Sequence, residues 1–228
     1  MRDARALALL RKMSDRLQRA KSFTVRARTT VEVPVAGDVH ATFFNDVRVA
    51  LQRPDRLAAT RTGDLPEFRF AYDGKSMTAY LAGKGQWTTA AAPPTIDAML
   101  LAAYEQASLS FPADELVVAD PYAAITKDLV YAALVGQTTI AGHKTDHVVL
   151  ASSGLELQLW LDATSALPVA EAVVYLDHPR KQHFYVEYFE WRLDPKLPAS
   201  TFALPKPASA KEIEFRTIEL RAIEGAGQ

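Results

Sequence analysis

The segment GQTTIAGHKTDHVVLASSGLELQLWLDATSALPVAEAVVYL, residues 136–176, decides the fold. It contains three apolar runs, residues 147–151, 155–161 and 169–176, which are separated by short turn-forming segments. Strands joined by such short connections pair as antiparallel neighbours, because a parallel crossover needs about a dozen residues or more. In the middle run, leucine occupies every second position, which is typical of a strand with one buried and one solvated face. We therefore predict a three-stranded meander that forms the centre of a broad antiparallel sheet.

The same alternation extends in both directions from this segment. Residues 22–91 contain about six further strands, with a strong hairpin signal at Asp73-Gly74. Residues 130–193 form the second meander, which ends in a long strand rich in aromatic residues. A sheet of about eleven antiparallel strands has to curl, because the twist between strands accumulates. The curl predicts a half-barrel with a concave face.

Two helical regions are available to cover that face. Residues 3–21 carry an apolar stripe at the helical period, and residues 95–129 contain two or three shorter helices, the first capped by Thr95. The predicted fold class is therefore α+β, a strongly curved antiparallel half-barrel with helices over its concave face. We predict a single domain, residues 1–228, whose last part, residues 194–228, is a proline-rich tail.

Composition excludes several classes of function. The chain has no cysteine, so it forms no disulfide and uses no thiol chemistry, and its formal net charge of -1 gives no reason to expect nucleic acid. Residues 1–21, however, hold seven Lys or Arg against two Asp. This basic helix favours contact with a membrane surface or an acidic partner, although a merely solvated helix face has the same pattern. No apolar run reaches the roughly 18 residues of a membrane span. The first residues do not have the pattern of a secretory signal, so we expect either a cytoplasmic protein or a sequence that begins after a removed signal.

Motifs for catalysis are missing from the sequence. His143 and His147 are four apart, a spacing that holds zinc on a helix, but they lie at a turn-to-strand junction, so no metal site is predicted. Glu187 and Glu190 are three apart in a strand, which predicts opposite faces and no paired acid and base. We expect no cofactor and no enzymatic activity. A hydrolase would need a clustered acid–base pair that the linear sequence does not reveal.

Apolar side chains remain as the candidate functional feature. They either line a cavity between helices and sheet or simply pack together as a core. The candidates are Met13, Leu17, Met99, Leu100 and Tyr104 on the helices, and Val49, Phe70, Met77, Leu157 and Leu159 on the strands.

The order of several short motifs resembles a known family. These are Ser22-Phe23, Arg53-Pro54, Asp73-Gly74-Lys75 with Tyr80, Gly136 and Gly142 before His147, Trp160-Leu161-Asp162 with Leu167-Pro168, and Phe202 with Pro205 and Pro207. In this order they resemble the bacterial periplasmic lipoprotein-carrier (LolA/LolB-like) superfamily, and in particular a branch of predicted periplasmic proteins.

The resemblance implies an open half-barrel, a lid of helices and an apolar cavity that in the carriers takes the acyl chains of lipoproteins. It also implies a periplasmic location after removal of a signal peptide, and it makes Arg53 a candidate latch that bonds to the lid. A related stress-sensor branch binds protein partners and lipid-like molecules.

These observations leave two main functions open. The first is a carrier or sensor that binds a lipid, an acyl chain or a lipoprotein. The alternative is a protein-interaction or envelope-sensor module with a filled core, which docks a partner through Tyr185, Tyr188 and Trp191 or through the basic first helix.

Overall fold

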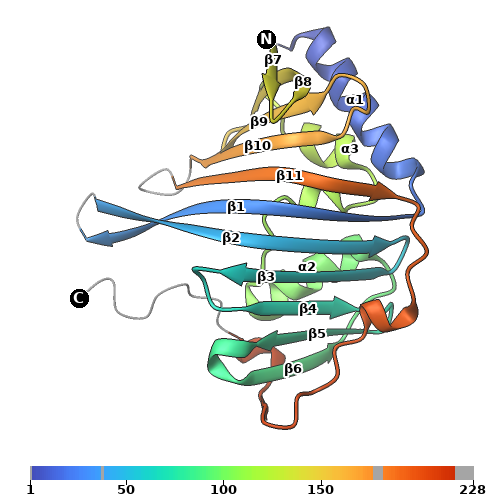
Figure 1. The fold of residues 1–228 in the computed structure, drawn as a ribbon, viewed down its shortest axis with the longest axis vertical. Coiled ribbons are helices and arrows are strands. Elements are labelled where there is room, and N and C mark those ends of the chain that lie inside the picture. The colour runs from blue at the N-terminus through green and yellow to red at the C-terminus, as the bar shows by residue number, and fades with distance from the viewer. Residues whose placement is uncertain (1, 37–38, 177–181, 219–228) are drawn as a thin grey trace.

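The structure of the protein, a computed structural model, describes residues 2–36, 39–176 and 182–218. Its strands form one sheet in the order β12-β6-β5-β4-β3-β2-β1-β11-β10-β9-β8-β7 (Figure 1). The strands are β1 (Ser22–Ala36), β2 (Val39–Gln52), β3 (Arg56–Gly63), β4 (Phe68–Tyr72), β5 (Ser76–Leu81), β6 (Gln86–Ala91), β7 (Tyr131–Ile140), β8 (His143–Ala151), β9 (Leu155–Asp162), β10 (Pro168–Tyr175), β11 (His183–Leu193) and β12 (Lys211–Glu212).

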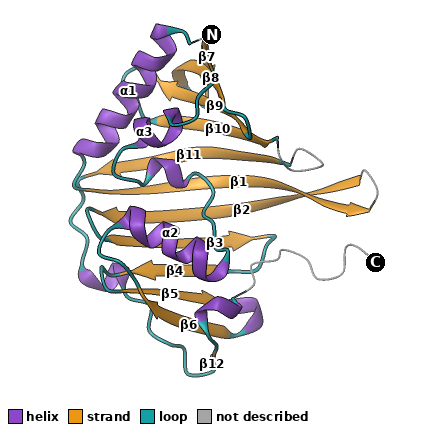
Figure 2. Cartoon of the chain, turned by 180° about the vertical axis from the view of Figure 1, so that it is seen from behind, coloured by secondary structure: helices purple, strands orange, loops and turns teal. Residues whose placement is uncertain are grey.

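The sheet is curved and open, and its neighbouring strands are antiparallel except β12, which pairs with β6 in parallel. Three α-helices accompany the sheet, together with short 3₁₀ turns, and Figure 2 shows the α-helices on one face. The predicted α+β class is confirmed. The helices are α1 (Ala4–Arg19), α2 (Ile96–Ala107) and α3 (Pro121–Thr126), and the 3₁₀ turns are η1 (Ala82–Lys84), η2 (Asp114–Leu116), η3 (Ala199–Phe202) and η4 (Phe215–Thr217).

The predicted element ranges agree with the structure in both meanders. Strands β1 to β6 occupy the first meander, and β7 to β11 occupy the second. In the proline-rich tail, the one strand of the described residues, β12, is two residues long, and η4 follows it after Glu214. Residues 219–228 of the predicted tail lie outside the described residues.

The prediction that residues 136–176 form the centre of the sheet is wrong. Strand β7 is one edge, and β1 and β11 lie in the middle. The sheet is completed by pairing between these two strands, from Phe23 opposite Leu193 to Val31 opposite Phe184. Turn chemistry determines which consecutive strands are neighbours, whereas the position of a meander within the sheet depends on this pairing between distant parts of the chain.

Helix α1 covers the part of the sheet formed by β7 and β8 and also contacts α3. Its N-cap is Asp3, whose carboxylate accepts a hydrogen bond from the backbone N–H of Arg5 at 2.8 Å. One stripe of the helix is completely buried against the sheet, as the sequence period predicted. The apolar members of that stripe are Ala6, Leu10, Met13 and Leu17. Among the described residues, no helix is long and apolar enough to cross a membrane.

Helix α2 lies across β3 and β4 (Figure 2). Thr95 caps it, since the side-chain oxygen of Thr95 accepts a hydrogen bond from the N–H of Ala98 at 3.2 Å. The helix ends at a left-handed Ser108, after which the chain runs between the two helix-covered parts of the sheet. This passage, residues 110–118, is called the lid segment below.

Strand β11 contains a bulge that changes which side chains face inward. Glu190 has a left-handed φ of 56°, and the register with β1 shifts there. As a result, Tyr188 and Trp191 both face the interior, while Glu187 and Glu190 both lie on the outer face, where Glu190 pairs with Arg26 at 2.7 Å. The predictions that the two glutamates face opposite ways, and that Tyr188 and Trp191 are exposed for docking, are therefore wrong.

Candidate functional site

An apolar cavity of about 160 Å³ lies between the middle strands and the lid segment. Alternation in β1 to β3 directs one set of side chains into this space, and small residues such as Ala27 and Ala59 leave it unfilled. The lining comes from β1 (Phe23, Val25, Ala27, Thr29 and Val31), β2 (Asn45, Val47 and Val49), β3 (Leu57, Ala59, Thr60 and Arg61), the β3–β4 connection (Leu65), the start of β4 (Phe68), the lid segment (Ser110, Phe111, Pro112, Ala113, Asp114, Leu116 and Val117) and β11 (Phe184, Val186, Tyr188 and Trp191).

The lid segment separates this cavity from two further hollows. A wide groove of about 780 Å³ shares Val31, Phe184 and residues 110–114 with the cavity, so the two spaces adjoin along the lid segment. A side groove of about 380 Å³ lies between the lid segment, α2, α3 and strands β8 and β9. The volume of the apolar cavity is close to that of the 150 Å³ cavity that accommodates benzene in another protein. The volume of the wide groove is within the usual range of about 300–1,000 Å³ for ligand pockets.

Arg53 ties the end of the lid segment to the rest of the fold. Its guanidinium donates to the carbonyl oxygens of Val118 at 3.0 Å and Val117 at 3.3 Å, and more weakly to that of Leu17 in α1 at 3.5 Å. Burial lowers the pKa of Arg53, and the carboxylate of Asp97 partly opposes this. These contacts are the ones that a latch between the sheet, α1 and the lid segment requires.

A group of acids and tyrosines lies where the lid segment meets β10 and β11. The hydroxyl of Tyr188 donates to Glu171 at 2.6 Å, and Glu171 is only 1% exposed. Burial raises the pKa of Glu171 to about 7, and burial and the neighbouring Glu171 raise the pKa of Glu115 well above its usual value. Burial and the nearby acids raise the pKa of Tyr175 to about 12. The pair formed by Glu115 and Glu171 therefore retains a proton near neutral pH.

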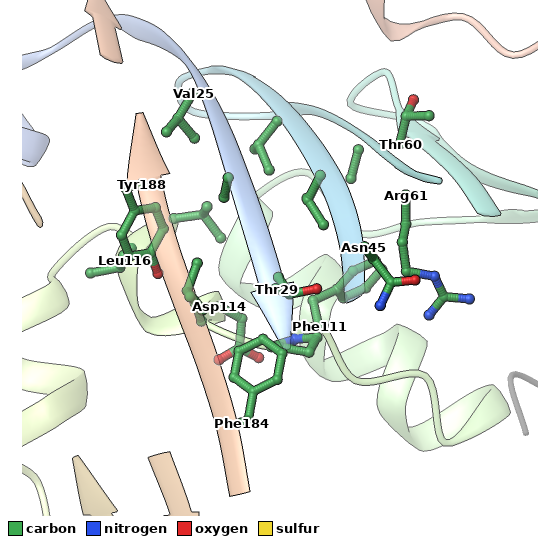
Figure 3. Close-up of a pocket in the computed structure, with 18 of the residues that line it drawn as sticks. Val25, Thr29, Asn45, Thr60, Arg61, Phe111, Asp114, Leu116, Phe184 and Tyr188 are labelled. Atoms are coloured by element: carbon green, nitrogen blue, oxygen red, sulfur yellow. The ribbon is translucent and has the colours of Figure 1, made fainter. Parts of the chain in front are cut away.

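The opposite end of the cavity carries hydrogen-bond donors. Asn45 is 2% exposed, and its side-chain oxygen accepts a hydrogen bond from the N–H of Leu65 at 3.0 Å, while its Nδ2 has no partner. Arg61 donates through one terminal nitrogen to the carbonyl oxygen of Pro66 at 3.1 Å, and its Nε is buried without a partner. Figure 3 shows Asn45 and Arg61 side by side at this end, with Asp114 and Tyr188 at the other. The cavity is therefore apolar in its middle and differs in charge between its two ends.

The predicted lining residues are divided among several places. Val49 lines the apolar cavity, and Leu100 and Leu157 line the side groove. Tyr104 is 61% exposed, so the inward position predicted for it from the helical period is wrong: the buried stripe of α2 ends at Ala103. The remaining candidates are at most 2% exposed and belong to the packed core, and these are Met13, Leu17, Phe70, Met77, Met99 and Leu159.

Sequence reasoning missed most residues that shape the site. The acid pair joins η2 to β10, which are far apart in the sequence, and no local spacing links them. One signal was present, since Glu171 is a single charge within the apolar run of β10. Arg61 gave no signal, because an arginine in an alternating strand usually faces water.

The two histidines of the dismissed metal motif have other partners. The Nδ1 of His143 is 3.0 Å from the carboxylate of Asp162, and the Nε2 of His147 is 3.0 Å from the side-chain oxygen of Gln158. The ring of His147 also stacks on Trp160 at 4.2 Å. These contacts give both histidines structural roles at the surface of β8 and β9.

Comparison with known families decides what kind of protein this is. Residues 6–216 match the family described as predicted periplasmic protein (DUF2092). The chain belongs to this DUF2092 family. The match confirms the periplasmic localisation that the motif order implied. A search of curated proteins finds no match.

The fold of this DUF2092 chain is shared with several solved structures. This chain is similar to an uncharacterised conserved protein from Thermus thermophilus, with 14% identity, coverage of 92% of this chain and 99% of that chain, and a TM-score of 0.51. It is also similar to MucB, with 11% identity, coverage of 92% and 65%, and a TM-score of 0.50. A third similar structure is the lipoprotein LppX from Mycobacterium tuberculosis, with 16% identity, coverage of 86% and 98%, and a TM-score of 0.46. The lipoprotein-carrier-like fold of this DUF2092 protein is confirmed.

Proposed function

We propose that this DUF2092 protein binds a lipid or acyl chain, free or attached to a lipoprotein, between the sheet and the lid segment. The observation that carries the proposal is the apolar cavity of about 160 Å³. An unfilled space of this size costs stability, about 24 cal/mol per Å³ or roughly 4 kcal/mol in all, so a chain that retains it has a use for it. The adjoining wide groove offers room for the part of the ligand that the cavity does not hold.

The energetics favour an aliphatic ligand. By analogy with benzene, a cavity of this size holds about six carbon atoms, and each buried methylene contributes about 0.8 kcal/mol. About 5 kcal/mol is therefore available from the cavity before the costs of binding. A longer chain gains further energy by extending along the lid segment into the wide groove, or by displacing the lid segment and breaking the Arg53 contacts.

The proposed role is non-enzymatic. The buried acid pair at Glu115 and Glu171 resembles an acid–base arrangement, and its carboxyls interact with each other and with Tyr188. Glu171 is 1% exposed and its carboxylate accepts a hydrogen bond from Tyr188, so an ester and a water molecule have no open approach to it. We infer that the pair acts in holding the lid segment. Hydrolysis of an acyl ester by the wild-type protein that Glu171→Gln abolishes would contradict this inference.

The binding proposal is tested in two steps. First, mass spectrometry of an organic extract of the purified protein should reveal a co-purifying lipid, and a fluorescent fatty-acid probe should bind and be displaced by unlabelled acyl chains. Second, Ala59→Phe should fill the cavity and weaken probe binding at least tenfold, while the control Ala58→Phe, on the outer face of the same strand, should not. Absence of both lipid and probe binding would refute the function.

A second candidate function is docking of an envelope protein. Phe44 is 54% exposed and Tyr185 is 40% exposed, and both lie opposite Thr30 in the ladder, so they form one apolar spot on the outer face. The similar protein MucB has also been solved in a complex of MucA and MucB from Pseudomonas aeruginosa. Capture of a periplasmic protein that Phe44→Ser and Tyr185→Ser together abolish would favour docking over lipid binding.

The basic face of α1 is a further contact surface in this proposal. Arg11, Lys12 and Arg16 are exposed, while the opposite stripe of the helix is buried. We propose that this face contacts an anionic membrane surface, from which a lipid could enter the wide groove or to which it could be delivered.

A further inference from the structure

The donor-lined end of the apolar cavity is unusual because two buried nitrogens have no acceptor. Asn45 is 2% exposed, and its Nδ2 and the Nε of Arg61 make no hydrogen bond. A buried donor without a partner costs about 1–3 kcal/mol. Both residues line the cavity itself, so the missing acceptor has a place to lie.

The register of the sheet brings these two donors together. Arg61 on β3 is opposite Val47 on β2, and Asn45 is two residues before Val47 on the same strand. Residues in this diagonal relation point to the same face and lie within reach of a long side chain. Figure 3 shows the amide and the guanidinium next to each other at the edge of the cavity.

Charge at this end is not compensated by the protein. Burial lowers the pKa of Arg61, and among the described residues no acidic side chain opposes this effect. The guanidinium donates a hydrogen bond to a neutral acceptor, the carbonyl oxygen of Pro66. A half-buried guanidinium with a free Nε and no carboxylate partner favours binding of an external anion.

We propose that Arg61 and Asn45 bind the carboxylate of a fatty acid whose chain lies in the apolar cavity. This inference rests on the proposed function and adds the chemical class of the polar group and its orientation. The carboxylate lies at the β2–β3 end, and the hydrocarbon chain runs toward β11 and the lid segment. The reverse orientation would bring the carboxylate to Asp114, an acidic side chain that lines the other end of the cavity, where no cationic side chain of the lining is present to bind it.

The experiment compares three probes that share a twelve-carbon chain: dodecanoate, its methyl ester and dodecylamine. Isothermal titration calorimetry with the wild-type protein should give at least tenfold tighter binding of dodecanoate than of the ester, because only the carboxylate pairs with Arg61. Arg61→Met should abolish this difference and leave the ester affinity within about twofold. The matched control is Arg48→Gln, which removes an exposed arginine from the outer face of β2.

A second variant tests whether Arg61 has only a structural role. Asn45→Asp retains the oxygen that accepts from Leu65 N–H but replaces the free donor by a negatively charged acceptor. This substitution should weaken the binding of dodecanoate at least tenfold and leave the affinity for the methyl ester unchanged. Circular dichroism should show that both variants remain folded.

The outcomes separate this inference from the proposed function. If dodecanoate and the ester bind equally to the wild-type protein, or if Arg61→Met weakens both to the same extent, the inference is overturned and the proposed function stands. Tightest binding of dodecylamine also overturns the inference alone. If none of the three probes binds, the proposed function fails and the inference fails with it.

Discussion

Replacement of Glu171 by glutamine should change how the stability of this DUF2092 protein depends on pH. Glu171 is 1% exposed, accepts a hydrogen bond from Tyr188 and faces Glu115 of the lid segment. Glutamine has nearly the same shape and can still accept from Tyr188, but it does not ionise. The substitution therefore removes one titration from the buried pair and leaves the packing nearly unchanged.

The magnitude follows from the raised pKa of Glu171, about 7 in the folded protein against 4.5 in an ordinary glutamate. Each pKa unit corresponds to about 1.4 kcal/mol, so ionising this group costs about 3 kcal/mol more in the folded than in the unfolded state. Below pH 4.5 the carboxyl is protonated in both states and the cost is absent. Between 4.5 and 7 the unfolded chain releases the proton first, so the free energy of unfolding falls as pH rises, and above 7 the loss is complete.

The assay is urea unfolding of the wild-type protein and Glu171→Gln between pH 5 and pH 8. The free energy of unfolding of the wild-type protein should fall relative to that of the variant by an amount on the order of 2–3 kcal/mol over this interval. Asp162, whose pKa is lowered to about 2 by hydrogen bonds from Ser165, does not titrate in this window. Glu187→Gln, on the exposed outer face, is the control and should leave the pH dependence as it is. Parallel pH profiles for Glu171→Gln and the wild-type protein would refute the buried-pair argument.

Three further predictions test the lid, the core and the basic helix. Arg53→Met should leave two lid carbonyl oxygens without a hydrogen-bond donor, so the rate of ligand release in stopped-flow displacement should rise at least tenfold. Arg53→Lys should give an intermediate rate. An unchanged release rate would show that Arg53 is not a latch. Leu10→Ala should lower the free energy of urea unfolding by about 2–5 kcal/mol, because this side chain is completely buried, and a loss below 1 kcal/mol would mean that α1 packs loosely. Replacing Arg11, Lys12 and Arg16 by glutamate should weaken co-sedimentation with anionic vesicles about 100-fold or more, since each basic residue near such a surface contributes about 1 kcal/mol; equal sedimentation would exclude α1 as the membrane contact.

Local sequence was sufficient for the secondary structure and for the fold class. The alternating leucines of β9 predicted a strand with one buried face, and three of them, Leu157, Leu159 and Leu161, are buried as expected. The stripe of α1 and the cap at Thr95 were also readable, because helix and strand periods and caps depend on residues a few positions apart. The motif order was enough to identify the carrier-like fold.

The site itself was decided by tertiary structure. Pairing of β1 with β11 put the first strand at the centre of the sheet, and the cavity formed there instead of beneath α1. The bulge at Glu190 placed Trp191 on the same inner face as Tyr188, against the simple alternation.

The same holds for the charges of the site. The sequence by itself determined which residues could be buried, since that depends on local period. Only the tertiary structure decided which polar groups are buried together, because Glu115 meets Glu171, and Asn45 meets Arg61, through strand register and the path of the lid segment across the sheet. Those encounters depend on contacts between distant parts of the chain, and no local pattern encodes them.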